Sequence, residues 1–198
     1  MKEGEILFYA DSGLLFRKPV RSFFEKAFEE SSKDIILFSY NTKEYGYASW
    51  SATGDTFHAL DCETEKCRNA PHVWAGAILL KNSVTSRQFI KDWLECCKLP
   101  GMLQGVSKRP PYEGFVHHQH DEGILGVVAA KEIKNVHYIP IDNVFYSYMR
   151  MHRRKDNSYS LLGYTSSDML GFEKKLLEKP IFKQIRKAIQ YFSNERAD

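Results

Sequence analysis

Residues 117–122 of this sequence read HHQHDE and place three histidines and two acids within six positions. Histidine titrates near neutral pH and binds metals, while a carboxylate can take a proton or stabilise a positive centre. Asp121 and Glu122 are therefore our candidate catalytic residues. Metallo-hydrolases use the pattern H-x-H-x-D-H, but here the aspartate follows His120 directly and Gly123 stands in place of the last histidine. The alternative without chemistry is that Asp121 caps a helix, because its carboxylate can accept backbone N–H groups.

A second cluster follows the first apolar run, where YADSG places Asp11 directly before Ser12 and Gly13. A carboxylate that leaves a buried strand at a turn can hold a hard divalent cation, which takes oxygen ligands and keeps waters for a phosphate. Asp11 is our candidate metal ligand, with Ser12 and Gly13 as neighbouring substrate-binding candidates. The alternative is that Asp11 serves only as a turn residue.

The stretch HVWAGAILLK, residues 72–81, carries two small residues where a ligand could approach the backbone closely. Ala75 and Gly76, together with Trp74, are candidates for lining a substrate pocket. The alternative is an ordinary core strand.

The basic stretch MRMHRRKD, residues 149–156, offers His152 as a nitrogen ligand to a metal and Arg153 as a partner for a diphosphate. A solvated basic loop is the alternative.

The elements that must position these groups follow from the hydrophobic pattern. Short apolar runs predict buried strands at residues 5–11, 34–40, 72–81 and 136–142. Apolar residues at helical spacing predict helices at residues 18–32, 85–98 and 121–131. We expect the second of these helices to bury one face, formed by Phe89, Ile90, Trp93, Leu94 and Cys97.

The segments between these elements are predicted to be loops. Residues 41–69 are irregular, with a weak helix at 54–60, and residues 142–160 form another loop. Residues 99–117 are rich in proline and glycine, and loops of this length in compact domains are often functional.

Strands that alternate with helices predict an α/β fold with a mixed, mostly parallel sheet flanked by helices. We expect a core domain at residues 1–160 and a helical extension at 161–198 that packs on it. In open α/β sheets, ligands bind beyond the carboxyl ends of the strands, which is where Asp11 would lie.

The composition excludes several classes of protein. Hydrophobic residues make up 43% of the 198 residues, and the net charge is only +3, which gives no argument for nucleic-acid binding. No apolar stretch is long enough to span a membrane, and the first residues do not resemble a signal peptide. The four cysteines are too few for a secreted disulfide scaffold, so we expect reduced thiols and a cytoplasmic protein. Zinc held by Cys62 and Cys67 is an alternative, although C-x4-C lacks a second pair.

In order, the strings YADSG, SWSATGDTF, WAGAILLKNS with FIKDWLECC, and FVHHQHDEGIL resemble those of a family. They are similar to the Y-x-D-[AS]-G, W-T-K-R-D-x-F and F-x-x-H-R-H-D-Q-S-I-L strings of GT-A-type glycosyltransferases. These proteins occur in bacterial surface-polysaccharide clusters, large viruses and some eukaryotes, and the layout is more distantly similar to glycogenin-like transferases. The resemblance covers residues 4–140.

The resemblance implies roles for the candidate residues. Asp11 matches an acid that holds Mn²⁺ or Mg²⁺ on the donor's diphosphate, and residues 74–76 match a strand that lines the donor-sugar pocket. His120 and Asp121 match the H-D-Q turn near the reacting carbon. His152 resembles a late histidine that reaches back to the metal. This sequence departs from the family at three positions. The family usually has an acid where this sequence has Tyr9, a glutamine in place of Glu122 and a serine in place of Gly123.

A further departure concerns the start of the sequence. Family members usually begin with another strand–helix–strand portion that grips the nucleotide, whereas this sequence starts almost on the strand before Asp11. Three explanations stay open: a fragment, a short gene model, or a protein that has lost the nucleotide half. The last would leave apolar surface exposed and favour homo-oligomers.

These observations predict a metal-dependent, hexosyltransferase-like enzyme of polysaccharide biosynthesis. Its partners would be a nucleotide-sugar donor, most simply a UDP-sugar, and a glycan or lipid-linked acceptor. One alternative is a non-catalytic remnant that binds a glycan or a partner. Another is a metal-dependent hydrolase built on His117, His118 and His120.

Overall fold

A computed structural model describes residues 2–40 and 46–151 of the chain. The chain divides into two compact units, Met1–Arg150 and Met151–Asp198, and the account below concerns the first. The predicted helices at 161–198 and the candidate residues His152 and Arg153 lie outside the described residues.

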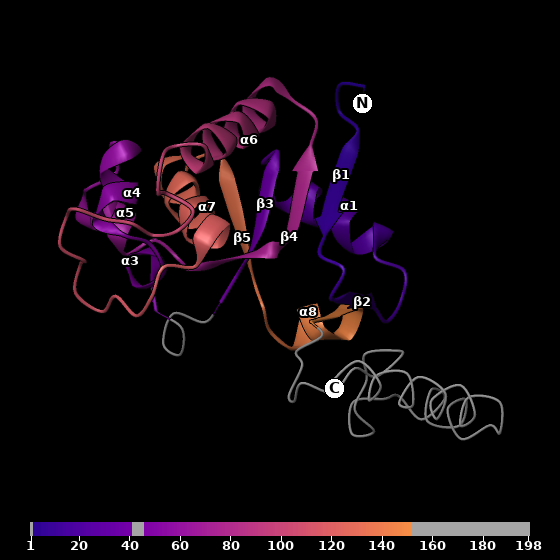
Figure 1. The fold of residues 1–198 in the computed structure, drawn as a ribbon. Coiled ribbons are helices and arrows are strands. Elements are labelled where there is room, and N and C mark those ends of the chain that lie inside the picture. Colours follow the sequence, from indigo (N-terminus) through magenta and orange to yellow (C-terminus); the bar gives the residue numbers. More distant parts are fainter. Residues whose placement is uncertain (1, 41–45, 152–198) are drawn as a thin grey trace, which may run out of the picture. The chain divides into compact units, whose positions relative to one another are not determined.

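The centre of the first unit is a four-stranded sheet with the order β1-β4-β3-β5 (Figure 1). It contains β1 (Ile6–Ala10), β3 (Ile35–Ser39), β4 (Val73–Lys81) and β5 (Val136–Pro140). The prediction of a mixed sheet flanked by helices is confirmed. The expected predominance of parallel pairing is wrong, because β4 runs antiparallel to both of its neighbours and only β3 and β5 pair in parallel. The error arose because a strand's apolar run does not encode its direction.

The middle strand β4 contains a bulge that matters for the site. Leu37 of β3 pairs with Ile78, but the next residue, Phe38, pairs with Trp74. Residues 75–77 of β4 therefore have no partner on β3 and turn towards β1, where Ala10 pairs with Ala77. A bulge of this kind leaves backbone groups without ladder partners and re-aims the side chains around it.

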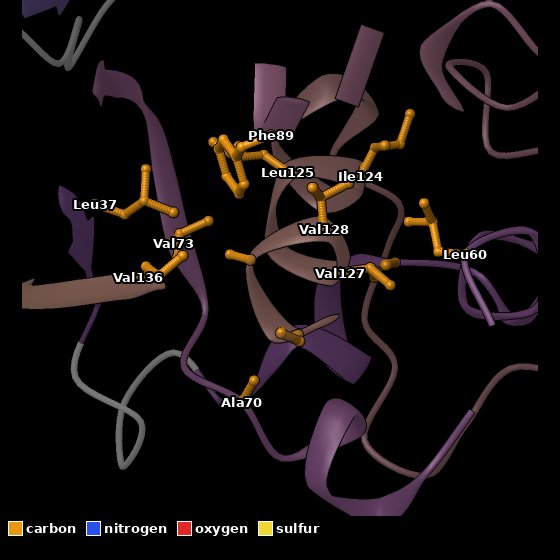
Figure 2. Packing of buried hydrophobic residues seen from close by; sticks show 14 of the residues in the cluster. Leu37, Leu60, Ala70, Val73, Phe89, Ile124, Leu125, Val127, Val128 and Val136 are labelled. Atoms are coloured by element: carbon orange, nitrogen blue, oxygen red, sulfur yellow. The ribbon is translucent and has the colours of Figure 1, made fainter. Parts of the chain in front are cut away.

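Two helices cover one face of the sheet, α6 (Val84–Cys97) and α7 (His120–Lys131) (Figure 1). Residues 123–130 of α7 are all buried, so this helix lies in the centre of the larger hydrophobic cluster (Figure 2). Phe89 of α6 packs into the same cluster, whose labelled members also include Leu37, Val73, Leu125, Val128 and Val136. Burial of this extent is the main source of stability for such a helix.

The expected apolar face of α6 is correct in part. Phe89 is buried, and Ile90, Trp93 and Cys97 pack against the larger cluster, but Leu94 is 50% exposed and Cys96 is buried in its place. On the same helix, the indole N–H of Trp93 donates a hydrogen bond to the carbonyl of Asp121 at the start of α7.

The opposite face of the sheet is covered by α1 (Arg21–Ser31) and α8 (Asn143–Tyr148). Phe24 and Ala27 of α1 pack with Phe145 of α8 in a second cluster that includes Ile36, Phe38 and Leu79 of the sheet. The helix α8, the strand β6 (Met149–Met151) and its partner β2 (Leu14–Phe16) replace segments that were predicted to be loops. Their short runs carry too few apolar repeats to show a period in the sequence.

The segment 46–69 also holds more structure than expected. The weak helix at 54–60 is confirmed as α4 (Gly54–Ala59), and two single-turn helices, α3 (Ala48–Ser51) and α5 (Glu65–Arg68), flank it. Cys62 and Cys67 form a disulfide, so the expectation of reduced thiols is wrong for this pair, and neither sulfur is a zinc ligand. Disulfides persist in oxidising surroundings, and the cytoplasmic location that the cysteine count suggested stays a prediction.

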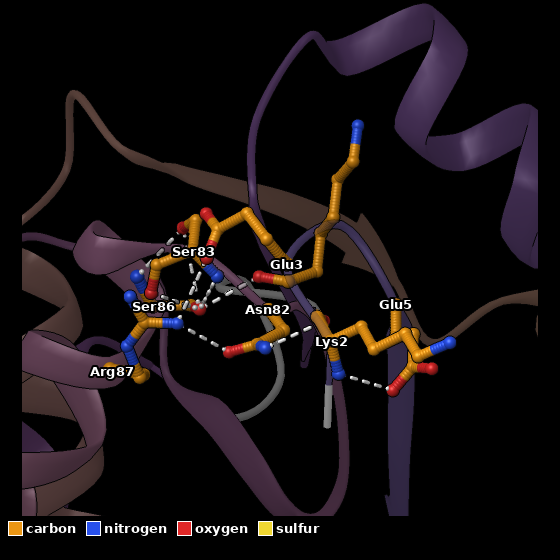
Figure 3. Close-up of polar contacts among 8 residues, drawn as sticks. Lys2, Glu3, Glu5, Asn82, Ser83, Ser86 and Arg87 are labelled. Atoms are coloured by element: carbon orange, nitrogen blue, oxygen red, sulfur yellow. Dashed lines mark hydrogen bonds and ion pairs between the residues drawn. The ribbon is translucent and has the colours of Figure 1, made fainter.

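The residues before β1 are attached to the turn between β4 and α6 (Figure 3). Asn82 donates to the carbonyl of Lys2 and accepts from Arg87, whose guanidinium also contacts Glu3. Ser83 and Ser86 form a capping box at the start of α6. These contacts hold the first residues of β1 against the sheet, so that its opposite end, with Asp11, is placed by the register of the strand.

Candidate functional site

Asp11 lies at the carboxyl end of β1, where the bulge of β4 begins. Its backbone N–H donates to the carbonyl of Gly76 at 2.9 Å, and its own carbonyl accepts from Leu14 at 2.9 Å, which closes a turn through Ser12 and Gly13. Asp11 is thus a turn residue, as the alternative stated. Its side chain takes no part in that turn, however, and is exposed. The carboxylate is available for a second role.

The side chain of Asp11 belongs to a group that we call the open acidic edge, formed by Tyr9, Asp11 and Asp121. The Tyr9 hydroxyl donates to Oδ1 of Asp11 at 2.7 Å. This hydrogen bond, followed by partial burial and then by the charges of Asp11 and Asp121, raises the pKa of Tyr9. The Tyr9 hydroxyl is therefore influenced by both carboxylates, directly by Asp11 and, as the smallest cause, through the charge of Asp121.

Asp121 is in the first turn of α7 but does not cap the helix. The N-cap position is Gln119, no side-chain cap bond is present, and Asp121 follows the first helical residue, His120. The capping alternative is therefore wrong, and the helix begins one residue earlier than predicted. The carbonyl of Asp121 accepts from Nε1 of Trp93 at 2.9 Å, which fixes the backbone of this turn while the carboxylate stays exposed.

The backbone of His120 is held in an uncommon conformation. Its φ is +46°, in the left-handed region that non-glycine residues seldom occupy, and its Nδ1 lies 2.8 Å from the carbonyl of Leu103. Backbone strain of this kind costs about 1–3 kcal/mol and collects at functional sites. It sets the direction in which the chain enters α7, and with it the position of Asp121.

Glu122 belongs to a different group, the buried polar cluster of His72, Gln119 and Glu122. Its Oε2 accepts from the N–H of Ala75 at 3.0 Å, and its Oε1 lies 3.3 Å from Nε2 of His72. Nε2 of His72 also lies 2.9 Å from Oε1 of Gln119. The N–H of Ala75 lies within the bulge, where β3 offers no acceptor, so Glu122 supplies the missing partner. With 18% of its side chain exposed and both oxygens engaged, Glu122 positions the bulge beside Asp11.

Position 123 requires a glycine because α7 passes very close to α3 there. A Cβ at this position would meet the carbonyl oxygen of Ser51 at 2.1 Å, which no side chain could tolerate without a shift of backbone. The serine of the resembled family could not stand here in this arrangement. The departure at 123 is therefore explained by packing.

The candidate residues of β4 point to two different faces. Ala75 belongs to the larger cluster beneath α7, whereas Trp74 packs against the second cluster and meets Phe145 edge-to-face at 6.0 Å. The indole of Trp74 lies across Gly76, where a Cβ would approach the ring to 2.4 Å. Gly76 is thus required for the packing of Trp74, and only its carbonyl contacts Asp11.

The histidines of residues 117–120 do not converge. His118 packs against Gly105 and meets His120 edge-to-face at 6.2 Å, and burial followed by the neighbouring His120 lowers its pKa. Within residues 2–40 and 46–151, no three His, Cys, Asp or Glu side chains gather closely enough to hold a metal ion. The histidine-based hydrolase site is therefore not assembled by the part of the chain that is described.

A divalent cation fits the open acidic edge with help from a ligand. Asp11 uses one carboxylate oxygen for Tyr9 and keeps the other free of hydrogen bonds to the described residues, and Asp121 adds a second negative charge nearby. Magnesium-type ions are commonly held by one or two carboxylates together with waters and substrate phosphates. The donor set suits this mode of binding.

A cavity of about 420 Å³ lies between α3, α5 and the loop that leads to α7. Its lining combines three aromatic side chains with charged and polar ones: Tyr47, Ser49, Trp50, Glu65, Arg68, Asn69, Tyr112, Glu113 and Gly114. The carbonyls of Trp50 and Ser51 accept from Val116 and Gln119, so the cavity wall and the first turn of α7 share one backbone frame.

Several residues of the site were missed from the sequence. Tyr9 was noted only as a departure from an acid and Trp93 only as part of the apolar face of a helix, and His72 and Gln119 were not singled out. Tyr9 and Asp11 have i, i+2 spacing, which puts both side chains on one face of a strand, and this signal was present in the sequence. The other three depend on contacts between distant segments.

No helix within the described residues is both long and apolar enough to cross a membrane. Comparisons with known proteins find no significant match to this chain, whether among protein-family models, curated proteins or solved structures.

Proposed function

We propose that this protein is a metal-dependent glycosyltransferase that moves a sugar from a nucleotide-sugar donor to a hydroxyl group of an acceptor. The observation that supports the proposal is the open acidic edge. Of two acids chosen from the sequence for different steps of this reaction, Asp11 accepts a hydrogen bond from the Tyr9 hydroxyl, and the charge of Asp121 is the smallest of the causes that raise the pKa of Tyr9. Such edges are the usual ligand sites of α/β sheets.

In this proposal Asp11 binds the cation through the oxygen that Tyr9 leaves free, and the Tyr9 hydrogen bond fixes the orientation of the carboxylate. A Mn²⁺ or Mg²⁺ ion bound there would neutralise the charge that develops on the departing nucleoside diphosphate. Ala75 and Gly76 form the wall beside it, and Glu122 keeps that wall in place through the Ala75 N–H.

Asp121 is the carboxylate nearest to the reacting carbon in this proposal. Its side chain is exposed while its backbone is held by Trp93, so the carboxylate is presented to a ligand from a fixed turn. There it takes the proton of the acceptor hydroxyl or stabilises the positive charge that develops on the sugar ring. Glu122, whose oxygens are both engaged, acts as a positioning residue.

Titration calorimetry with UDP and a panel of UDP-sugars, with and without Mn²⁺, tests the proposal. We expect binding that requires Mn²⁺ and that Asp11→Asn weakens at least tenfold, while Asp121→Asn keeps donor binding and loses transfer. A well-folded chain that binds no UDP-sugar in the presence of Mn²⁺ would overturn the proposal. A glycan-binding protein without catalysis would then be favoured, because the aromatic cavity suits a sugar independently of a nucleotide.

A further inference from the structure

We propose that the cavity lined by Tyr47, Trp50, Arg68 and Tyr112 binds a neutral sugar ring of the acceptor glycan. This cavity would give the acceptor of the proposed reaction a binding site and a charge class. Its role as an acceptor site rests on the proposed function. The cavity volume of about 420 Å³ lies within the roughly 300–1,000 Å³ that is common for small-ligand sites.

The aromatic side chains of the cavity suit the C–H face of a sugar. A pyranose ring presents C–H groups on its faces and hydroxyl groups around its rim, and the electron-rich face of an aromatic ring attracts the former. Tyr47 lines the cavity and is 38% exposed, so part of its side chain is open to a ligand.

Trp50 is held rigidly in the cavity wall. Its indole is enclosed by two glycines from separate loops, Gly46 and Gly114, where a Cβ would come within 2.0 and 2.2 Å of the ring. Both glycines have positive φ, at 71° and 81°, a conformation that favours glycine over other residues. Glycine at both positions therefore leaves the space that the Trp50 indole occupies. This side of the cavity is formed without a ligand.

The polar side chains of the cavity can bind the hydroxyl rim. Glu65, Glu113 and the amide of Asn69 offer acceptors, and Asn69 and Arg68 offer donors. The guanidinium of Arg68 lies over the ring of Tyr112, 4.8 Å from its centre, so its N–H groups are held in a fixed plane at the cavity wall. This alternation of donors and acceptors around aromatic faces matches a polyhydroxylated ring.

The charge of the lining selects against anions. Two carboxylates, Glu65 and Glu113, face one guanidinium, so the described lining is net negative. A phosphate, a nucleotide or an acidic sugar would be repelled, which separates this cavity from the donor's diphosphate at the open acidic edge. Among sugars, a neutral hexose or N-acetylhexosamine fits this lining better than an acidic one.

The cavity is connected to Asp121 through the backbone. The loop that forms its wall at residues 112–114 reaches α7 at His120, and α3 holds that loop through the Trp50 and Ser51 carbonyls. The disulfide between Cys62 and Cys67 joins α5, the opposite wall, to the end of α4. A sugar in the cavity is therefore positioned by the same frame that positions the catalytic turn.

Saturation-transfer NMR and calorimetry on the full chain test this inference. The probes are the methyl glycosides of glucose, galactose, mannose and N-acetylglucosamine, with glucuronate as the anionic comparison. We expect at least one neutral glycoside to bind at least ten times more tightly than glucuronate. Tyr47→Ala and Asn69→Ala should each weaken that binding at least tenfold, whereas Phe16→Ala, an exposed aromatic outside the cavity, should leave it unchanged.

The two proposals fail in distinguishable ways. No binding of any neutral glycoside, or binding that neither cavity variant weakens, overturns the sugar site even where UDP–Mn²⁺ binding persists. Glycoside binding in a chain that fails to bind UDP–Mn²⁺ upholds the sugar site and overturns the transferase. Tyr47 and Asn69 are both exposed, so each variant is expected to fold, and either one suffices if the other does not.

Discussion

Asp121 and Glu122 are neighbours in the first turn of α7, yet they belong to different surroundings. Glu122 directs its carboxylate into the buried polar cluster, where both oxygens are engaged with Ala75 and His72. Asp121 leaves its carboxylate exposed, and its charge contributes to the raised pKa of Tyr9. Successive residues of a helix point about 100° apart, so two adjacent acids can face different surroundings. One can then serve the structure while the other is available to bind a ligand. Engagement of the carboxylate oxygens, rather than position in a motif, therefore separates the two roles.

The largest expected effect is on catalysis. Asp121→Asn removes the charge but keeps the shape, and the loss of a positioned acid or base commonly costs about 10²–10⁴ in rate. We expect sugar transfer to fall by at least about a hundredfold with the melting temperature unchanged, because the side chain makes no structural hydrogen bond within the described residues. Transfer assays and thermal denaturation of the same sample provide the check. A large drop in melting temperature would mean that the open acidic edge is structural as well.

The next effect is on stability and concerns the other carboxylate. Glu122→Ala leaves the Ala75 N–H without its acceptor and removes one contact of the buried His72, and an unsatisfied buried group costs about 1–3 kcal/mol. We expect the free energy of unfolding, measured in urea, to fall by about 1–3 kcal/mol, and by less in Glu122→Gln, which keeps one acceptor oxygen. Glu29→Ala, an exposed acid on α1, serves as the control and should change little. Equal effects of Glu122→Ala and Glu29→Ala would remove the distinction between the two acids of α7.

A third test moves the helix itself. Gly123→Ala forces a methyl group into the Ser51 carbonyl, and overpacking of this kind costs about 1–3 kcal/mol. Gly126→Ala, one turn later, meets only ordinary contacts at 3.8 and 3.9 Å and should stabilise the helix by up to about 1 kcal/mol. Urea denaturation of the pair measures both. If the two variants behave alike, α7 is free to shift and does not hold its two acids in fixed surroundings.

The smallest effect is a change in titration. Asp11→Asn should lower the pKa of Tyr9 towards its ordinary value more than Asp121→Asn does, because the hydrogen bond from Tyr9 to Asp11 is the largest cause of the raised pKa. Ultraviolet difference spectra or NMR of the tyrosine ring follow the titration.

The sign of the accompanying stability effect is fixed by linkage. Since the folded pKa of Tyr9 lies above the unfolded value of about 10, its contribution to stability is complete below that pH and declines as the pH rises through the folded pKa. The alkaline decline should therefore be smaller in Asp11→Asn and be complete at a lower pH, because only the folded pKa of Tyr9 changes. If Asp121→Asn leaves the pKa of Tyr9 unchanged, Asp121 lies away from the open acidic edge. The distinction drawn between Asp121 and Glu122 would then be lost.

The parts of the fold that were predictable are those with a local signal. The apolar runs of β1, β3, β4 and β5 and the helical spacing of Phe24 and Phe89 identified the sheet and its main helices. The two acids of the edge were identifiable because each stands at the junction of an apolar element and a loop.

The remaining features depend on contacts between distant segments. No pattern in residues 72–81 reveals that β4 leaves the register of β3, and therefore none reveals that the Ala75 N–H needs Glu122. The pairing of Cys62 with Cys67 requires the turn between α4 and α5, which short polar stretches do not disclose. The aromatic residues of the cavity, Tyr47 and Tyr112, come from separate segments that the fold brings together. No local pattern in the sequence therefore identifies them as part of one site.

The bulge in β4 also decides which changes of length the chain can accept. It holds an odd number of residues, so Trp74 shares a layer with Ala77 and Leu79 while Val73 and Ala75 share the other layer with Ile78 and Leu80. Deleting a single residue there would reverse this parity and send the indole of Trp74 into the layer beneath α7. Insertions and deletions should therefore be tolerated in the surrounding loops, whereas a single-residue change of length within residues 75–77 should not be tolerated.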